Sequence, residues 1–335
     1  MRLLLPFILL CSASASADWL RREASIMGTE ITVELYHEDE SVAVSAAESV
    51  LNEMRRIDSS MNPANDSSEL AQVNVHASKR PFTISDELFS LINDSVRFSQ
   101  LTHGAFDITF SSAGYLYDYR KSRRPDQNTL TSLLPLINYR HLLLDSDVKS
   151  IRFAKPGVRI DLGGIAKGHA VDRCIQLLQE QGISHALVTA GGDSRVIGER
   201  WGRPWNIGIR DPRDQNKLVA VIPLEDVAVS TSGDYERYFE EDGIRYHHIL
   251  DPVTGDSARA LQSVTIIGPD TLTTDALSTG LFVLGLEDGL KLANKLKDID
   301  AILVDRFGNL HYSDGLLSIT NTVQDGQSIV KSSGR

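Results

Sequence analysis

The sequence lacks an excess of positive charge. Its 335 residues include 34 Lys and Arg against 45 Asp and Glu, which gives a formal net charge of −11 at pH 7. Proteins that hold nucleic acid through its phosphates present a basic surface. We therefore expect no nucleic acid partner, although isolated phosphate groups could still be bound through backbone N–H groups, a metal or a few local cations.

Cysteine is scarce as well. The chain has two cysteines, Cys11 and Cys174, and Cys11 lies in a segment that we expect to be removed. A single remaining cysteine cannot form an internal disulfide, so the mature fold has to rely on its hydrophobic core. Cys174 lies in a predicted helix, and the simplest interpretation is a small buried apolar residue.

Long hydrophobic runs are absent after the first residues. Residues 3–10 are apolar, follow Arg2, and are too few to cross a bilayer. Small residues with an Ala15-x-Ala17 pattern come next, which predicts a secretory signal peptide over residues 1–17. We therefore expect an exported, periplasmic protein. The alternatives are an uncleaved anchor attached to the inner membrane and a lipoprotein at Cys11.

Helical and strand-like segments alternate irregularly along the rest of the chain. Their order does not follow the strict β-α alternation of a doubly wound sheet, so the sequence predicts an α+β fold. We expect one domain over residues 18–320 and a loose polar tail over residues 321–335. Apolar periodicity predicts helices at 41–57, 86–101, 164–181, 273–284 and 287–296, and strands at 24–36, 185–189, 205–209, 219–223, 227–230, 246–250, 263–267 and 301–305.

A glycine pair between a predicted strand and a predicted helix is the most informative local pattern. Asp161 is followed by Gly163-Gly164, and Lys167 lies in the first turn of the helix. The glycines allow a ligand to approach the backbone, and the helix N-terminus offers N–H donors to an anion. The turn carbonyls could equally face a hard cation. The pattern is neither a Walker A loop nor G-x-G-x-x-G.

A second pattern pairs Asp275 with Thr279. Residues i and i+4 of a helix lie on one face, and a carboxylate and a hydroxyl one turn apart suit a Mg²⁺ ion that keeps several waters. The competing interpretation is a helix N-terminus capped by Thr273 or Thr274, with Asp275 beside the positive end of the dipole.

A histidine pair, His247-His248, ends a predicted strand before a Pro/Gly turn. Successive strand residues point to opposite faces, so at most one of the two should face a given site. A neutral histidine there could take a proton from an attacking hydroxyl. The sequence contains no H-x-x-x-H or C-x-x-C pattern for zinc.

Taken together, these segments resemble the ApbE-type FAD:protein FMN transferases. The similarity extends over most of the mature chain, and seven motifs occur in the family's order. They are Met27-Gly28-Thr29, Gly104-Ala105-Phe106-Asp107, Asp161-Leu162-Gly163-Gly164-Ile165-Ala166-Lys167-Gly168, Gly191-Gly192-Asp193, Ser230-Thr231-Ser232-Gly233-Asp234-Tyr235, His248-Ile249-Leu250-Asp251-Pro252-x-x-Gly255 and Thr274-Asp275-Ala276-Leu277-Ser278-Thr279.

The resemblance implies a single ApbE-like (T-fold-like) domain and a role for each matched position. Some of the matched residues would bind FAD, and others would bind Mg²⁺. The FAD pocket would include Met27, Ala105, Phe106, Asp107, Asp161, Lys167, His248 and Ile249. The Mg²⁺ site would include the Gly164 carbonyl, Asp275 and Thr279, with Ser278 nearby. His248 would be the catalytic base.

The activity implied by the resemblance is Mg²⁺-dependent cleavage of FAD. FMN would pass through a phosphoester bond to a Thr or Ser of an acceptor protein, a membrane-associated redox subunit, and AMP would leave. One departure from the family pattern is Asn62, which stands near the position where many members carry an aromatic residue before Ser68-Glu69-Leu70. This departure leaves open an FAD pyrophosphatase that uses water as acceptor. A separate alternative is a protein that binds FAD without chemistry.

Overall fold

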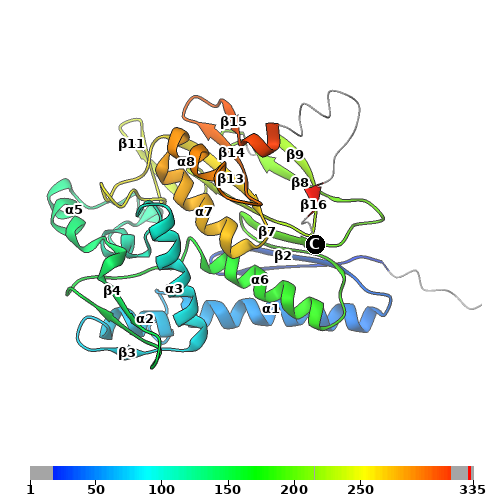
Figure 1. Ribbon diagram of the computed structural model, residues 1–335, viewed down its shortest axis with the longest axis horizontal. Coiled ribbons are helices and arrows are strands. Elements are labelled where there is room, and N and C mark those ends of the chain that lie inside the picture. Colours follow the sequence, from blue (N-terminus) through cyan, green and yellow to red (C-terminus); the bar gives the residue numbers. More distant parts are fainter. Residues whose placement is uncertain (1–17, 215, 318–330, 333–335) are drawn as a thin grey trace, which may run out of the picture.

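A computed structural model describes residues 18–214, 216–317 and 331–332 (Figure 1). The predicted signal peptide and most of the predicted tail lie outside these residues. Within the tail, Lys331–Ser332 form a short strand, β16, that pairs in parallel with β9 (Leu218–Glu225). Among the described residues, no helix combines the length and the apolar character needed to cross a membrane.

An eight-stranded antiparallel sheet forms the centre of the fold, in the order β1-β2-β6-β7-β10-β13-β14-β15. Every residue of β13 is buried, which places this strand inside the core. The strands are β1 (Leu20–Ile26), β2 (Thr29–Tyr36), β6 (His185–Ala190), β7 (Asp193–Ile197), β10 (Ala228–Gly233), β13 (Leu261–Gly268), β14 (Asp300–Asp305) and β15 (Leu310–Tyr312).

The strand predicted over residues 24–36 is wrong as a single element, because β1 and β2 form a hairpin there. Its two turn residues, Met27 and Gly28, have φ angles of 56° and 70°. A two-residue hairpin turn requires such left-handed conformations, which suit glycine but are uncommon for methionine. Met-Gly is a weak turn signal, so the alternating apolar residues on either side suggested one continuous strand.

Four helices pack on one face of this sheet (Figure 1). They are α1 (Glu40–Met61), α6 (Ala166–Glu180), α7 (Thr271–Leu284) and α8 (Leu286–Ala293). Their apolar faces join the sheet in one large core cluster. Cys174 of α6 is fully buried in that cluster, which confirms its predicted structural role.

The opposite face of the sheet carries a second, smaller cluster. It lies beneath β8 (Trp205–Arg210) and β9, and Trp205 and Leu224 pack there against Val229 of β10 and Ile267 of β13. The structure is therefore a layered arrangement of helices, a long antiparallel sheet and a short sheet. The predicted α+β class is confirmed.

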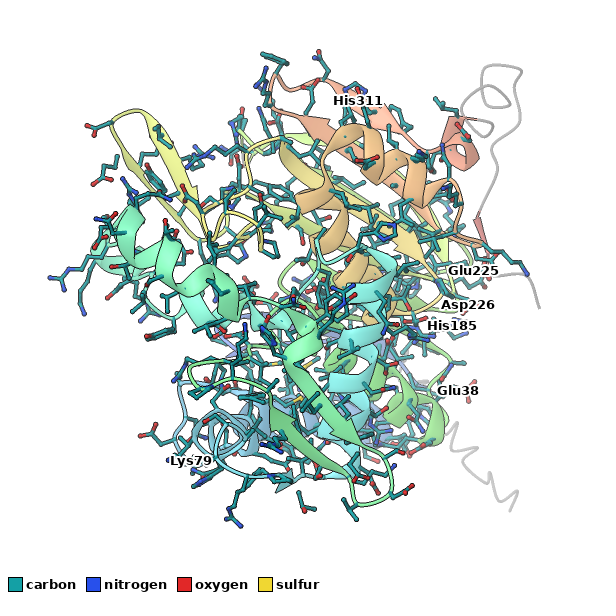
Figure 2. The ribbon with its side chains drawn as sticks, turned by 60° about the vertical axis from the view of Figure 1, so that its left-hand side comes forward. Glu38, Lys79, His185, Glu225, Asp226 and His311 are labelled. Atoms are coloured by element: carbon teal, nitrogen blue, oxygen red, sulfur yellow. The ribbon has the colours of Figure 1, made fainter. Side chains whose placement is uncertain are left out.

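The remaining elements gather at one end of the molecule. Figure 2 shows Lys79, which follows α2, and His311 of β15 at opposite ends. In Figure 1 the hairpin of β11 and β12 lies on the same side of the molecule as α5 and β4, and its two strands pair with each other and with no other strand among the described residues. The elements are α2 (Glu69–His76), α3 (Asp86–Leu101), α4 (Ser111–Gly114), α5 (Gln127–Leu133), β3 (Phe82–Thr83), β4 (Leu142–Asp145), β5 (Ser150–Phe153), β11 (Tyr238–Glu241), β12 (Ile244–His247) and the short 3₁₀ turns η1 (Ile108–Phe110), η2 (Tyr119–Lys121), η3 (Leu134–Leu136) and η4 (Tyr139–His141).

Candidate active site

A cavity of about 740 Å³ opens where this end of the molecule meets the sheet and the helices. Its lining includes every residue predicted for the site except Ser278. The seven motifs are spread over most of the chain, and each contributes residues to this single cavity. The fold therefore brings the separate sequence patterns together.

One end of the cavity holds a buried cluster of charges. The Lys167 ammonium lies 2.6 Å from Oδ2 of Asp193 and 3.3–3.4 Å from the two carboxylate oxygens of Asp275. Burial acts to lower the pKa of Lys167, but the two carboxylates outweigh it and raise this pKa. Burial and the like charge of Asp193 raise the pKa of Asp275, against the opposing effect of Lys167. The primary partner of Lys167 is thus Asp193, and Asp275 is left with weaker contacts.

Asp275 also joins two helices. Its Oδ2 atom accepts a hydrogen bond of 3.0 Å from the backbone N–H of Gly168, in the first turn of α6. The predicted alternative, a cap at Thr273 or Thr274, is wrong because α7 begins earlier and Asp270 caps it by accepting from the Thr273 N–H at 2.7 Å. Asp275 therefore lies in the second turn of α7 and faces α6 and the cavity.

Two hydroxyls extend the site one turn further along α7. Thr279 lines the cavity, and its Oγ1 lies 3.2 Å from the hydroxyl of Ser232 on β10. Ser278 is fully buried, donates to the Asp275 carbonyl at 2.9 Å and contacts Ser232 at 2.8 Å. Because its hydroxyl is occupied in this way, Ser278 supports its neighbours from behind the cavity wall.

The backbone at Gly164 lies close to the side chains of Thr279 and Phe106. A Cβ atom on Gly164 would lie 3.2 Å from Thr279 Oγ1 and 3.3 Å from a ring carbon of Phe106. Only a residue without a side chain leaves normal spacing between this turn and α7. The Gly164 turn and the side chains of Thr279 and Asp275 therefore border the same part of the cavity.

These groups fit a hard cation. They are all oxygen donors, and the described residues contain no cluster of three or more His, Cys, Asp or Glu side chains that could hold a metal. Among the described residues, the Asp275 Oδ1 atom makes only the 3.4 Å contact with Lys167, so it is available to a ligand. One carboxylate with neutral oxygens suits Mg²⁺, which retains waters and completes its shell with substrate phosphate.

The segment before the glycine pair is not the predicted strand. Residues 154–165 form no strand, and the backbone of Ile160 is held on both sides by the Asn74 side chain, at 2.8 and 2.9 Å. The Asp161 N–H donates to the Ile108 carbonyl at 3.0 Å, and its side chain accepts from Gly163 N–H at 2.7 Å. Burial raises the pKa of the Asp161 carboxyl. Long-range side-chain bonds hold this segment, which local periodicity could not reveal.

The histidine pair divides as expected between two surroundings. His247 ends β12, is buried, and its Nε2 lies 2.6 Å from the Ala258 carbonyl. His248 lines the cavity, and its buried Nδ1 has no hydrogen-bond partner among the described residues. Burial, reinforced by the charge of Arg237, lowers the pKa of His248 to about 3. A neutral imidazole at this position can accept a proton.

This geometry agrees with the outcome of the family comparison. The family model described as "ApbE family" matches residues 27–303. The chain belongs to the ApbE family. It is 32% identical to a protein of Treponema pallidum over 88% of this chain and 86% of that one, and 33% identical to a protein of Vibrio cholerae over 87% and 89%. Both relatives are named FAD:protein FMN transferase.

Solved ApbE structures share the fold. The ApbE protein of Thermotoga maritima superposes with a TM-score of 0.83 at 36% identity, over 90% of this chain and 99% of that one. The flavin transferase ApbE of Vibrio cholerae gives a TM-score of 0.81 at 28% identity over the same shares. The ApbE fold predicted from the motifs is therefore confirmed.

The structure adds three residues that the sequence had not assigned to this ApbE site. Asp193 and Ser232 belong to two of the seven motifs, but the resemblance implied no role for either residue. Arg237 gave no signal, because it follows a turn and belongs to no periodic element. It lines the cavity, its guanidinium lies 3.3 Å from the Gly28 carbonyl, and its own carbonyl accepts from the His248 N–H at 3.1 Å.

The opposite end of the cavity is more open and less charged. Asn62 ends α1, lines the cavity, and its Oδ1 accepts from the Ala64 N–H at 3.0 Å. Tyr115, 53% exposed, also lines the cavity, with the Arg159 guanidinium 4.9 Å from its ring centre. Position 62 itself carries no aromatic ring, and Tyr115 supplies an aromatic side chain to the same cavity.

The predicted segment around Phe106 forms another part of the cavity wall. Ala105 and Ile249 line the cavity, and Phe106 is buried at its wall against Phe98. The carboxylate of Asp107 accepts from Thr109 and from the Tyr139 N–H, and burial raises its pKa. The Asp107 oxygens are thus occupied by the protein, which indicates that this residue shapes the wall.

Proposed function

We propose that this protein is an exported FAD:protein FMN transferase that acts in the periplasm. The observation that carries the proposal is the arrangement of one cavity: Asp275, Thr279 and the Gly164 turn form an oxygen-lined end, and a neutral His248 lines the same space. A cavity of about 740 Å³ is of the size that encloses a substantial ligand. The names of the relatives supply FAD as that ligand.

Asp275, Thr279 and the Gly164 carbonyl would hold Mg²⁺. When bound, the ion would neutralise the negative charge that develops on the pyrophosphate as its P–O–P bond breaks. Lys167 adds a fixed positive charge beside this position. Its hydrogen bond with Asp193 keeps the ammonium at the cavity wall, so the charge is in place before the substrate arrives.

His248 would receive the proton of the attacking hydroxyl. The oxygen of a Thr or Ser on the acceptor protein forms a bond with the FMN-side phosphorus, the bond from that phosphorus to the bridging oxygen breaks, and AMP leaves with the bridging oxygen. The low pKa of His248 keeps the imidazole neutral at physiological pH, and its buried Nδ1 has no hydrogen-bond partner among the described residues. The imidazole is therefore free to accept the proton as the new bond forms.

The acceptor we propose is a protein outside this chain, namely a membrane-associated redox subunit. The direct test incubates residues 18–335 with FAD, Mg²⁺ and a library of flexible peptides that each carry one central Thr. Transfer gives a peptide whose flavin fluorescence survives denaturation, together with AMP. Failure to label any peptide or acceptor domain, while FAD remains intact, would contradict the proposal.

A second candidate activity is supported by Asn62. Many family members carry an aromatic ring near this position, beside the adenine or the isoalloxazine of FAD, and without that ring water could replace the protein hydroxyl as acceptor. This FAD pyrophosphatase would release free FMN and AMP in equal amounts from FAD and Mg²⁺ alone. A protein that only binds FAD would give neither product.

A further inference from the structure

The hairpin of β11 and β12 lies beside the candidate active site. It pairs with no other strand among the described residues, and it leads directly into His248. Arg237, just before β11, lines the cavity mouth together with Glu236. One end of the hairpin thus lies at the active site, and the other end projects from it.

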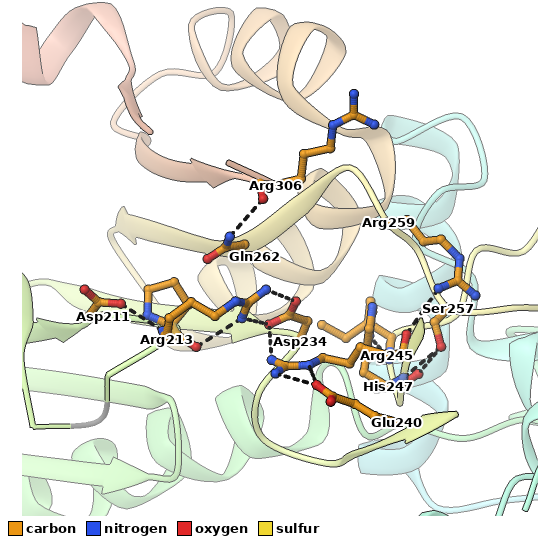
Figure 3. Close-up of polar contacts among 12 residues, drawn as sticks. Asp211, Arg213, Asp234, Glu240, Arg245, His247, Ser257, Arg259, Gln262 and Arg306 are labelled. Carbon is orange, nitrogen blue, oxygen red and sulfur yellow. Dashed lines mark hydrogen bonds and ion pairs between the residues drawn. The ribbon is translucent and has the colours of Figure 1, made fainter. Parts of the chain in front are cut away.

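The outer edge of β12 is already occupied (Figure 3). Ser257 bonds with both the N–H and the carbonyl of His247, at 2.8 and 2.7 Å, and Arg259 donates to the Arg245 carbonyl at 3.2 Å. Backbone groups of His247 and Arg245 therefore point away from β11. The residues that alternate with these two point their backbone groups toward β11 instead. His248, the next residue in this alternation, donates its N–H to the Arg237 carbonyl at 3.1 Å.

The register then fixes which groups of β11 point outward. Tyr238 pairs with His247 and Glu240 pairs with Arg245. In an antiparallel pair, two residues directly opposite each other point their N–H and C=O groups either both inward or both outward. Tyr238 and Glu240 therefore present these groups on the outer edge of β11, and no described residue hydrogen-bonds to them.

This edge is exposed and held in place. Tyr238 is 41% exposed. A network of ion pairs fixes the hairpin: Asp234 binds Arg213 and Arg245, and Arg245 binds Glu240 at 2.9 Å (Figure 3). On the other side, Arg124 binds Glu241 at 2.9 Å. A strand whose outward backbone groups are unpaired is a template for an added strand.

We infer that β11 binds an extended segment of the acceptor protein as an added strand, through the backbone of Tyr238 and Glu240. This inference rests on the proposed transfer to a Thr or Ser of another protein. A segment that leaves the edge at Tyr238 passes Arg237 and enters the cavity that holds His248. The edge thus recognises an extended backbone, and the cavity receives its hydroxyl.

The test compares Glu240→Pro with Glu240→Ala. Both lose the ion pair with Arg245, but only proline removes the outward N–H, and that N–H makes no bond within the hairpin. The substrate is the Thr peptide selected from the library, and the readouts are kcat/KM for its flavinylation and FAD affinity by flavin fluorescence. We expect kcat/KM to fall about tenfold in Glu240→Pro relative to Glu240→Ala, with equal FAD affinity.

Equal kcat/KM in the two variants would overturn the inference while leaving the transferase function intact. Absence of transfer by the unmodified protein would overturn both. A dimer that Glu240→Pro dissociates, seen by light scattering, would assign the edge to a second copy of this chain and overturn the inference. A backbone N-methyl scan of the peptide, with the unmodified protein, tests the same point without a variant: we expect losses at alternate residues, and uniform or no losses would contradict strand addition.

Discussion

The two ends of the cavity are built in different ways. At the charged end, Asp193 and Asp275 are almost fully buried and are joined by Lys167, so residues of β7, α6 and α7 fix one another. At the open end, Asn62 lies at a helix terminus, and Tyr115 is more than half exposed. The charged end is thus preorganised for one chemistry, and the open end can vary without disturbing the core.

The largest effect should come from Asp275→Asn at the charged end. The side chain keeps its shape but loses the charge that a cation requires, so we expect Mg²⁺-dependent AMP release from FAD to fall by on the order of 100-fold or more. The measurement is the initial rate over a Mg²⁺ titration. Asp270→Asn is the matched control, because Asp270 caps the same helix outside the cavity. Equal Mg²⁺ dependence in both variants would contradict the assignment.

Gly168→Ala should show that the charged end tolerates no added volume. The new Cβ atom would lie 2.3 Å from the Thr271 carbonyl oxygen and 2.8 Å from the Asp275 Cβ, so α6 and α7 would have to separate. We expect a loss of roughly 1–3 kcal/mol in the free energy of unfolding, measured by urea denaturation. At Gly289 the nearest atoms are 3.2 Å away or more, so Gly289→Ala should cost much less. If Gly168→Ala leaves the free energy of unfolding unchanged, α6 and α7 can move apart at little cost, and the prediction is wrong.

Thr279→Val should distinguish the role of the Thr279 hydroxyl from that of the neighbouring Ser278 hydroxyl. Valine keeps the volume of threonine but removes the oxygen that faces the cavity, so we expect apparent Mg²⁺ affinity to weaken about tenfold or more. Ser278→Ala should have a smaller effect on affinity, since that hydroxyl already bonds to the Asp275 carbonyl and to Ser232. A larger loss of Mg²⁺ affinity in Ser278→Ala than in Thr279→Val would indicate that Ser278, and not Thr279, binds the metal.

Asn62→Tyr tests the open end. A ring at this position adds a stacking surface for the flavin or the adenine, so we expect FAD to bind about fivefold more tightly or better, measured by fluorescence titration. Asn62→Leu is the control for loss of the amide without a ring. If the tyrosine variant changes affinity no more than the leucine variant, residue 62 does not contact a ring of the substrate.

The smallest effect concerns the pH range in which His248 stays neutral. Its pKa is lowered to about 3 by burial first and by Arg237 second, so the folded protein binds this proton only in strong acid. The unfolded chain binds it near pH 6.5, and His248 therefore reduces stability progressively as the pH falls from about 6.5 toward 3. Arg237→Gln should raise this pKa without restoring it to 6.5, because burial remains. NMR titration of the His248 ring tests this, and a pKa near 6.5 in the unmodified protein would contradict the burial argument.

The sequence predicted the parts of the site that local geometry determines and missed the parts that long-range contacts determine. Asp275 and Thr279 share a helix face by local geometry, and the glycine pair is a local turn, so their chemistry could be inferred from spacing. Arg237 and the Asn74 contact with Ile160 depend on segments that are distant in the chain, and no local pattern reports them.

The fold shows the same division. The helix predicted over residues 86–101 coincides with α3, since an amphipathic stripe and its Ser85 cap are local signals. The β1–β2 turn was missed because Met27 adopts a left-handed conformation that its side chain disfavours. Met27 lines the cavity, so local preference yields there to the demands of the site.

The central claim is that the charged end cleaves FAD and that the flavin half passes to a protein hydroxyl. The most direct measurement is the ratio of AMP released to flavin bound covalently, determined by chromatography and mass spectrometry in a reaction with FAD, Mg²⁺ and the Thr peptide. The account predicts a ratio near one that requires both Mg²⁺ and Asp275. AMP release that is matched entirely by free FMN, or that persists when Mg²⁺ is removed by EDTA, would contradict it.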